Sequence, residues 1–413
     1  MKLTGEERAM LRGERGEPVR RALELQLEVG KFYGAKRFVA VTNVHMMGDI
    51  EVMGDGGLAH LESLARKGAR CEVAITTNAR CFDFAYVDRF KQDAIEAAKE
   101  KQLIGFLKQM NVMTTDTCIN YQTTYQPHFG ERVAWGDTGT VIWANSVCGA
   151  RTNFESGPAA MAAAMTRRVP EYGFHLDRHR AGSILVEIET EIEDLAEWGA
   201  LGKTVGESHQ SYFAVPVFTG IRRAPTADEL KHLGASLASY GSMAMYHMVG
   251  VTPEAPTLRA ALRGGRPKER MRVRRGDIEK VFASYRNPDS TCNFVVFSGP
   301  QLSLFELRDL ADRFDGRRVH RGTTVFATTA SGVLAAARTL GYAQKLEAAG
   351  VTLLEGVCVY ILQNLSKMRA ANGWNNMISN SAKIVNTITA HKFNTILRRT
   401  QDCVDIACTG VFR

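Results

Sequence analysis

Short apolar runs alternate with longer amphipathic segments in the last third of the chain, and this alternation restricts the fold more than any other feature. Residues 294–297 (FVVF), 323–327 and 351–354 have the length and the branched or aromatic composition of buried strands. Residues 303–314 and 331–349 lie between them and are predicted to be helices. Strands linked by helices in this way pair in parallel through right-handed crossovers. The sequence therefore predicts an α/β protein.

A weaker version of the same alternation occupies the first third. Residues 1–35 are predicted to be helical, residues 37–42 and 71–75 to be strands, and residues 58–67 to be a helix between those strands. The second strand runs into polar residues 76–78 (TTN). Because open parallel sheets bind ligands at the carboxyl ends of their strands, we expect these residues to face a ligand.

The length of the chain predicts more than one structural unit. Its 413 residues exceed the roughly 250–300 residues at which a single hydrophobic core stops growing. We expect a division into residues 1–210, a helical lead-in with a first α/β unit, and residues 211–413, a second α/β unit.

Composition and charge exclude several classes of function. No run of ~18 apolar residues is present, so no membrane span is expected. The charged start, residues 1–18, lacks the apolar centre of a secretory signal, which predicts a cytoplasmic protein with reduced cysteines. Most of the net charge of +8 comes from residues 259–275, where no aromatic residues are interleaved. We therefore expect this segment to be a solvated basic surface and not a nucleic-acid site.

Three polar clusters contain the residues that could perform chemistry. Residues 114–121 (TTDTCINY) set Cys118 among hydroxyl and carboxylate groups, where it could be a metal ligand, a nucleophile or part of a turn. Residues 144–153 join small residues to Arg151, and arginine binds carboxylate or phosphate through paired hydrogen bonds. A structural ion pair would explain this arginine as well. Residues 375–383 combine amides, a serine and a lysine, which also suits a capped helix start.

Eight sequence blocks, taken in order, resemble those of one family, the large subunit of aconitase X. The resemblance covers nearly the whole chain and rests on LTGEERAMLRGERGE, NVHMMGD, AITTNARCFDF, MTTDTCINYQTTYQPHFGERVAWGD, WANSVCGARTN, LKHLGASLASYGSMAMYHMVGVTPEAP, SGPQLSLFEL and NSAK. It implies an aconitase-like fold, in which parallel-sheet α/β/α units pack around a central cleft.

The resemblance also implies an enzyme of the lyase class. Members of the family remove water from small hydroxylated acids, which include cis-3-hydroxy-L-proline and mevalonate 5-phosphate. An iron–sulfur cluster held by three cysteines binds the substrate oxygen there, and its Lewis acidity helps hydroxide to leave. We therefore expect a small anionic substrate and a separate small swivelling subunit that closes the site.

The set of cluster ligands implied by the resemblance is incomplete in this chain. Cys118 and Cys358 match two of the three cysteines. The third belongs to a Gly-x-Pro-His-Cys-Ser block, which reads SGPQLS at residues 298–303. Leu302 thus stands in place of the cysteine and Gln301 in place of the histidine, and leucine cannot bind iron.

Three interpretations of this loss remain open. Cys81, Cys148 or Cys292 could complete a relocated cluster. A single metal ion could instead bind to Cys118 and Cys358 together with nearby oxygen or imidazole groups. The site could also work without a metal, with one of these two cysteines as acid, base or nucleophile. We favour loss of the ordinary cluster, because no new cysteine stands in the vacated block.

The other predicted site residues follow from their positions in these blocks. Catalytic roles are predicted for Ser303 at a helix start, Lys383 and His45, with His247 as a second candidate proton carrier. Substrate binding is predicted for five further residues: Thr77, Asn78, Arg151, Thr152 and Asn153. We expect the pocket to form where Cys118, Arg151, Ser303 and Cys358 converge.

The leading functional hypothesis is a hydro-lyase, either a dehydratase or an isomerase, that acts on a small hydroxylated carboxylic acid. One alternative is a cluster-free member of the family that performs decarboxylation or cyclisation. Another is a binding protein without catalytic activity. The polar blocks favour an enzyme, because a chain that had lost its reaction would have little need of them.

Overall fold

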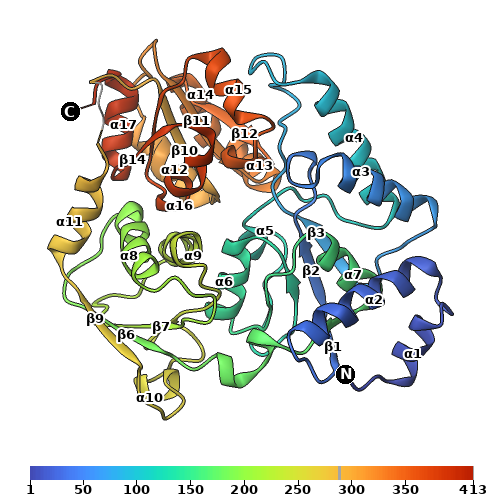
Figure 1. The fold of residues 1–413 in the computed structure, drawn as a ribbon. Helices are drawn as coiled ribbons and strands as arrows, with labels where there is room; N and C mark the ends of the chain where they lie inside the picture. Colours follow the sequence, from blue (N-terminus) through green and yellow to red (C-terminus); the bar gives the residue numbers. More distant parts are fainter. Residues whose placement is uncertain (287–289, 413) are drawn as a thin grey trace.

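The computed structural model describes residues 1–286 and 290–412, and its sheets divide this part of the chain into three regions (Figure 1). We name them the first region (residues 1–181), the second region (residues 182–286) and the third region (residues 290–412). Each is built on one sheet whose strands all pair in parallel. The α/β class predicted from the sequence is confirmed.

The first region contains a three-stranded sheet with the strand order β3-β2-β4. A separate antiparallel pair joins β1 to β5, because residues 38–40 turn away from the parallel sheet that they were expected to enter. The strands of this region are β1 (Phe38–Ala40), β2 (Asn43–Met46), β3 (Ala74–Thr77), β4 (Ala134–Trp135) and β5 (Arg168–Pro170). Its helices are α1 (Gly5–Leu11), α2 (Glu17–Phe32), α3 (Ile50–Arg66), α4 (Ala94–Gln109), α5 (Asn120–Thr123), α6 (Thr138–Ser146) and α7 (Pro158–Thr166).

The second region contains a four-stranded sheet with the order β8-β7-β6-β9. The division expected at residue 210 falls inside this sheet, between the paired strands β6 and β7. Its strands are β6 (Ile184–Ile188), β7 (Pro216–Thr219), β8 (His247–Met248) and β9 (Glu269–Val273). Its helices are α8 (Leu195–Ser208), α9 (Ala227–Gly241), α10 (Leu258–Ala261) and α11 (Arg275–Ser284).

The third region contains a five-stranded sheet with the order β12-β11-β10-β13-β14. Its strands are β10 (Phe294–Leu302), β11 (Thr324–Thr329), β12 (Thr352–Glu355), β13 (Asn376–Ser379) and β14 (Asn394–Leu397). Its helices are α12 (Leu304–Arg313), α13 (Ser331–Thr339), α14 (Tyr342–Ala349), α15 (Leu365–Asn372), α16 (Ala382–Thr387) and α17 (Thr400–Thr409). The three strands and the helix at 303–314 expected here are confirmed.

Two expected helices are each broken by glycine. The segment 331–349 forms α13 and α14, because Gly341 between them has a φ of +81°, a left-handed conformation that an α-helix excludes. The segment 1–35 forms α1 and α2, which Gly13 and Gly16 separate with φ angles of +82° and +90°. Glycine punctuation was visible in the sequence, but its effect inside an amphipathic run was not.

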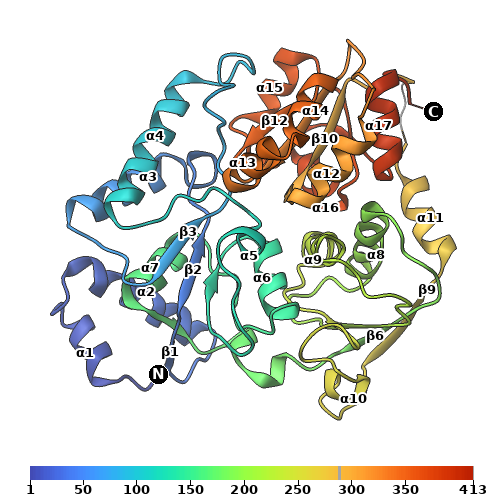
Figure 2. The ribbon, with the colours of Figure 1, turned by 180° about the vertical axis from the view of Figure 1, so that it is seen from behind.

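The three regions share one apolar core, which fixes their relative positions. The largest buried cluster runs from Ile119 in the first region through Leu233 in α9 to Ile384 in α16. In both ribbon views α8 and α9 lie between the four-stranded sheet and the third region (Figures 1 and 2). None of the helices in the described part of the chain has the length and apolar character needed to cross a membrane.

Candidate active site

The carboxyl ends of the first and third sheets face the same interior space. Asp137 follows β4 of the first sheet, and Cys358 and Lys383 follow β12 and β13 of the third. A hydrogen bond joins Lys383 to Asp137 across this space, although 246 positions separate the two residues in the sequence. This is the location at which parallel α/β sheets bind ligands.

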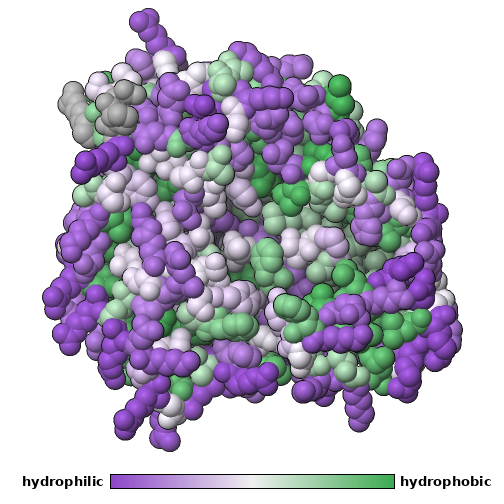
Figure 3. Space-filling view, in the orientation of Figure 1, coloured by the Kyte–Doolittle hydropathy of each residue, from purple (hydrophilic) through white to green (hydrophobic). Residues whose placement is uncertain are grey.

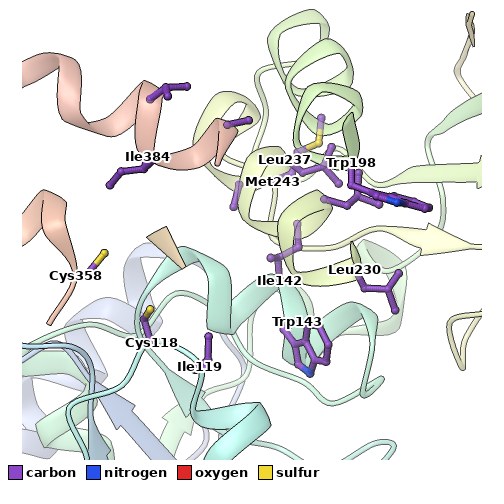
Figure 4. Packing of buried hydrophobic residues seen from close by; sticks show 14 of the residues in the cluster. Cys118, Ile119, Ile142, Trp143, Trp198, Leu230, Leu237, Met243, Cys358 and Ile384 are labelled. Atoms are coloured by element: carbon purple, nitrogen blue, oxygen red, sulfur yellow. The ribbon is translucent and has the colours of Figure 1, made fainter. Parts of the chain in front are cut away.

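Two cysteines meet at the centre of this space. Cys118 and Cys358 are 3% and 2% exposed, and Figure 4 shows them near one another on segments far apart in the sequence. The hydrogen bond between the two thiols raises the pKa of Cys118 and lowers the pKa of Cys358, while burial raises the pKa of both. Cys358 is therefore the more acidic thiol of the pair.

A buried ion pair lies beside these sulfurs. Lys383 Nζ is 3.2 Å from Asp137 Oδ1, and both side chains are 4% exposed. Burial lowers the pKa of Lys383, but the charges of Asp137, Cys118 and Cys358 outweigh burial and raise the pKa above its usual value. Lys383 therefore stays charged, and its ammonium can compensate a negative charge on either sulfur or on a bound anion.

Several buried polar atoms around the pair have no hydrogen-bond partner among the described residues. They are Asp137 Oδ2, His45 Nε2, Asn78 Oδ1, and both the oxygen and the nitrogen of the Asn120 side chain. The other ring nitrogen of His45 lies 2.8 Å from Thr76 Oγ1. Burial lowers the pKa of His45 to about 4, although the charge of Asp137 opposes this, so the ring is neutral near pH 7. Buried polar atoms without partners are uncommon and indicate a place for a ligand or water.

Gln301 joins the two cysteine-bearing segments. Its main-chain nitrogen donates to Cys118 Sγ at 3.2 Å, and its side-chain oxygen accepts from the main-chain nitrogen of Cys118 at 3.2 Å. Its side-chain nitrogen donates to the carbonyl oxygens of Asp116 at 3.2 Å and Val357 at 3.1 Å. The residue is fully buried.

The residues around the sulfurs do not match a cluster held by three thiolates. Gln301 faces the cysteines while Leu302 packs into the same apolar core as Phe297, because the register of β10 shifts between Phe297 and Leu302 and breaks the usual alternation of side chains. The other side chain of β10 that reaches the pair is Ser298, whose Oγ lies 3.7 Å from Cys358 Sγ. Within residues 1–286 and 290–412, no three histidine, cysteine, aspartate or glutamate side chains are grouped so that they could hold a metal ion.

The other cysteines considered as replacement ligands have surroundings of their own. The charges of Glu100 and Asp49 act on Cys81. Cys148 forms a hydrogen bond with Trp143, and Cys292 donates to a main-chain carbonyl in β10 at 3.6 Å. None of these contacts involves Cys118 or Cys358.

A pocket of about 580 Å³ opens between α5, α9, α12 and α13, next to the segment of Cys118. Tyr121, Trp143 and Phe305 form its apolar walls, and Gln122, Asp228 and Ser303 supply polar groups. Figure 3 shows that this face of the molecule is hollowed near its middle, where the three regions meet, and that hydrophilic residues dominate the periphery. Ile119, which directly follows Cys118 in the chain, is also part of the pocket wall.

Ser303 stands at the wall of this pocket and begins α12. Its hydroxyl donates to Asp228 Oδ2 at 2.7 Å and accepts from the main-chain nitrogen of Glu306 at 3.2 Å, which caps the helix. Lys231, which is fully buried, is paired with both Asp228 and Glu306. The structure therefore places Ser303 in a polar network that also fixes α9 against α12.

Several residues predicted to bind substrate form structural contacts instead. Arg151 donates to the carbonyl oxygen of His175 at 3.0 Å and to Asp177 at 2.5 Å. Thr152 and Asn153 bond to neighbouring main-chain groups. None of the contacts of Arg151 within the described chain reaches Cys118, Ser303 or Cys358, so the expected convergence of four residues does not include the arginine.

Two further predicted residues use their side chains in hydrogen bonds within the fold. Thr77 donates to Asp116 Oδ1 at 3.0 Å and so orients the carboxylate in the segment before Cys118. His247 shares a hydrogen bond of 2.7 Å with the carbonyl oxygen of Arg180. Both residues are buried within the fold.

Sequence reasoning did not identify Asp137, Gln301 or Asn120 as site residues, although it noted Gln301 as a departure from the family pattern. Strand alternation alone would have placed Leu302 on the face of Ser298 and the cysteines, because the register shift between Phe297 and Leu302 has no signal in the sequence. The pairing of Asp137 with Lys383 had no local signal, because it spans 246 positions of the sequence.

Comparison with known proteins agrees with this arrangement. Family models described as the first, second and third domains of aconitase X match residues 1–178, 182–283 and 292–409. The phosphomevalonate dehydratase large subunit of Methanothermobacter thermautotrophicus is 33% identical over 359 residues, which are 86% of this chain and 87% of that protein. The cis-3-hydroxy-L-proline dehydratase of Pseudomonas aeruginosa is 32% identical over 387 residues, which are 91% of this chain and 64% of that protein.

A solved structure shows the same architecture. The crystal structure of Thermococcus kodakaraensis aconitase X in its holo-form superimposes with a TM-score of 0.88 and 27% identity, and the match covers 98% of this chain and 100% of that one. The resemblance inferred from sequence blocks is thus confirmed. The chain belongs to the aconitase X family, and the dehydratases among its relatives place it with the hydro-lyases.

Proposed function

We propose that this chain removes water from a small hydroxylated carboxylic acid at the cluster formed by Cys118, Cys358, Lys383 and Asp137. The observation that carries the proposal is the ion pair of Lys383 and Asp137, which is buried beside two sulfurs at the carboxyl ends of two parallel sheets. A charged group is costly to bury, so its retention here supports a catalytic task.

The chemistry of such an elimination fits the groups present. A base must take the proton next to the carboxylate, and an acid must protonate the leaving hydroxide. In our proposal the thiolate of Cys358 accepts the proton from carbon, and the ammonium of Lys383 donates a proton to the departing hydroxide, which leaves as water. The unpartnered atoms of His45, Asn78 and Asn120 orient the substrate through hydrogen bonds.

The comparisons support a substrate and a partner of a particular kind. The relatives are named for phosphomevalonate and for cis-3-hydroxy-L-proline, both small hydroxylated acids. We propose a small anionic substrate that enters through the pocket beside Tyr121 and Ser303. Several relatives are named as large subunits, so we also propose a separate small subunit that closes this pocket.

The substitution Lys383→Met tests the function directly. Phosphomevalonate and cis-3-hydroxy-L-proline are incubated with the purified chain, with and without a candidate small subunit, and products that have lost water are measured by mass spectrometry. We expect Lys383→Met to lower the rate at least about 100-fold, because the interaction it removes acts on developing charge. Lys367→Met, on the exposed side of α15, is the matched control and should retain full activity.

The variant leaves Asp137 buried without its cation, so folding is checked by thermal unfolding. If Lys383→Met unfolds, the double variant Lys383→Met/Asp137→Asn restores a neutral site and replaces it in the assay. Undiminished turnover in either folded variant contradicts the proposed role of the ion pair.

A further inference from the structure

The side chain of Gln301 uses all of its hydrogen-bonding groups to hold the two cysteine-bearing segments. Its amide nitrogen has two N–H groups, and they bind the carbonyl oxygens of Asp116 and Val357. Its amide oxygen accepts from the main-chain nitrogen of Cys118. Val357 directly precedes Cys358 in the chain, and Asp116 lies two positions before Cys118. The glutamine thus bridges the first and third regions at the point where the sulfurs meet.

An iron–sulfur cluster would perform the same two tasks that protein groups perform here. It would tie Cys118 to Cys358, and its iron would compensate the charge of the sulfurs. In this chain Gln301 supplies the tie, and Lys383, which is 4% exposed, supplies the positive charge. The position of the third cysteine that a cluster needs is occupied by Leu302, whose side chain packs in the apolar core.

We propose that Gln301 is a positioning residue that replaces a cluster, and that the chain folds without iron. The inference concerns how the site is held together, so it stands whichever reaction the site performs. It predicts that the two cysteines are kept buried by hydrogen bonds to Gln301 and not by a metal.

The first measurement uses the unmodified chain. It is expressed with added iron and sulfide and purified without oxygen, and its iron, its acid-labile sulfide and its visible absorption spectrum are recorded. We expect iron and sulfide far below one per chain, no sulfur-to-iron absorption band, and a melting temperature that a strong iron chelator does not change. Iron and sulfide in stoichiometric amounts, or a melting temperature that falls on chelation, would overturn the proposal.

The second measurement asks whether Gln301 holds the cysteines. Gln301→Met keeps the shape of the side chain but removes its hydrogen bonds to the main-chain groups of Asp116, Val357 and Cys118, while the main-chain bond from residue 301 to Cys118 Sγ remains. The rate at which iodoacetamide alkylates each cysteine in the native protein is measured by peptide mapping. We expect alkylation of Cys118 and Cys358 to become at least about ten-fold faster, because local opening no longer has to break these bonds.

The matched control is Gln26→Met. Gln26 is also buried, and its side chain donates to the carbonyl oxygen of Arg168 in the first region. General loss of stability would expose all cysteines in both variants, whereas a positioning role selects Cys118 and Cys358 in Gln301→Met alone. If Gln301→Met does not fold, Gln301→Glu keeps the accepting oxygen and is measured instead. Unchanged protection of both cysteines in the folded variant contradicts the proposal.

Discussion

At the scale of single residues, buried polar atoms without hydrogen-bond partners lower the free energy of unfolding. Each such atom costs about 1–3 kcal/mol relative to a paired one. His45 Nε2, Asn78 Oδ1 and Asp137 Oδ2 are all in this state within the described chain, and they lie around the same sulfur pair. A cost concentrated in one place is expected where a ligand supplies the missing partners.

Glu155, which is not part of the site around the sulfurs, also has a buried polar atom that lowers the stability of the fold. Its side chain is 4% exposed, its Oε1 has no partner among the described residues, and burial raises its pKa to about 7. Because the folded pKa lies above the unfolded value, folding is favoured when the group is protonated, and stability is lost as the pH rises from about 4.5 through 7. Glu155→Gln should therefore raise the free energy of unfolding at pH 8 by up to about 3 kcal/mol.

Chemical denaturation at pH 4, 6 and 8 measures this effect. The gain from Glu155→Gln should shrink toward zero as the pH falls to 4, because the carboxyl is then neutral in both states. Glu28→Gln, at an exposed position of α2, is the control and should change stability little at any of these pH values. A gain that does not depend on pH would show that the raised pKa of Glu155 is not its cause.

Single residues show how far the sequence could predict the site. The blocks around Cys118 and Cys358 predicted that both belong to one site, and the structure brings them together. The role of Gln301 was not predictable, because its partners Asp116 and Val357 are 185 and 56 positions away. The residues around Arg151 have the composition of an anion site, but in the structure Arg151 forms an ion pair with the carboxylate of Asp177. Local composition cannot tell these two outcomes apart.

At the scale of elements, the helix pair α8 and α9 is packed unusually closely. A Cβ atom added to Gly202 would lie 2.7 Å from the carbonyl oxygen of Leu233 and 2.7 Å from Ser236 Cβ. Ser236 in turn donates to the carbonyl oxygen of Gly199 at 2.6 Å. The glycines of α8 thus let the two backbones approach, and this pair supports α16, which carries Lys383.

Two glycine substitutions of the same kind should therefore act in opposite directions. Gly202→Ala should lower the free energy of unfolding by about 1–3 kcal/mol, because the added methyl meets main-chain atoms that cannot move aside easily. Gly105→Ala in α4 has open space around it and should raise stability by about 0.5–1 kcal/mol through helix propensity. Denaturant melts of both variants measure the difference. Equal effects would contradict the close packing of α8 against α9.

The elements themselves were largely predictable because hydrophobic periodicity is a local property. The expected strands at 294–297, 323–327 and 351–354 correspond to β10, β11 and β12. The errors arose where one glycine conformation decides the outcome, as at Gly341 between α13 and α14. Strand β1 was also expected correctly, but its antiparallel partner β5 follows 130 positions later (residues 38 and 168), beyond any local pattern.

At the scale of the whole molecule, the pocket beside Tyr121 is lined by residues of all three regions. Trp143 of α6 forms part of its wall and stacks on Tyr121, with ring centroids 4.4 Å apart. Tyr121 lies three positions after Cys118 in the same segment. A ligand that enters this pocket therefore changes the surroundings of one tryptophan ring.

Tryptophan emission should report ligand binding in this pocket. The chain has four tryptophans, and only Trp143 is among the residues that line the pocket. A small hydroxylated acid that binds should change the emission, and Trp143→Phe should abolish most of the change while the affinity measured by calorimetry falls less than about ten-fold. Trp374→Phe, in the core of the third region, is the control and should leave the change intact. A signal that survives Trp143→Phe would place the ligand elsewhere.

The long separation of Asp137 from Lys383 also has a consequence in time. A ribosome that adds about 5–20 residues per second needs about 12–50 s to make the 246 positions between them. Until residue 301 is reached within that interval, neither the glutamine that will hold the sulfur nor the lysine that will neutralise the carboxylate has been made. The nascent thiol is therefore exposed to oxidants and stray metal ions far longer than it ever is in the finished protein.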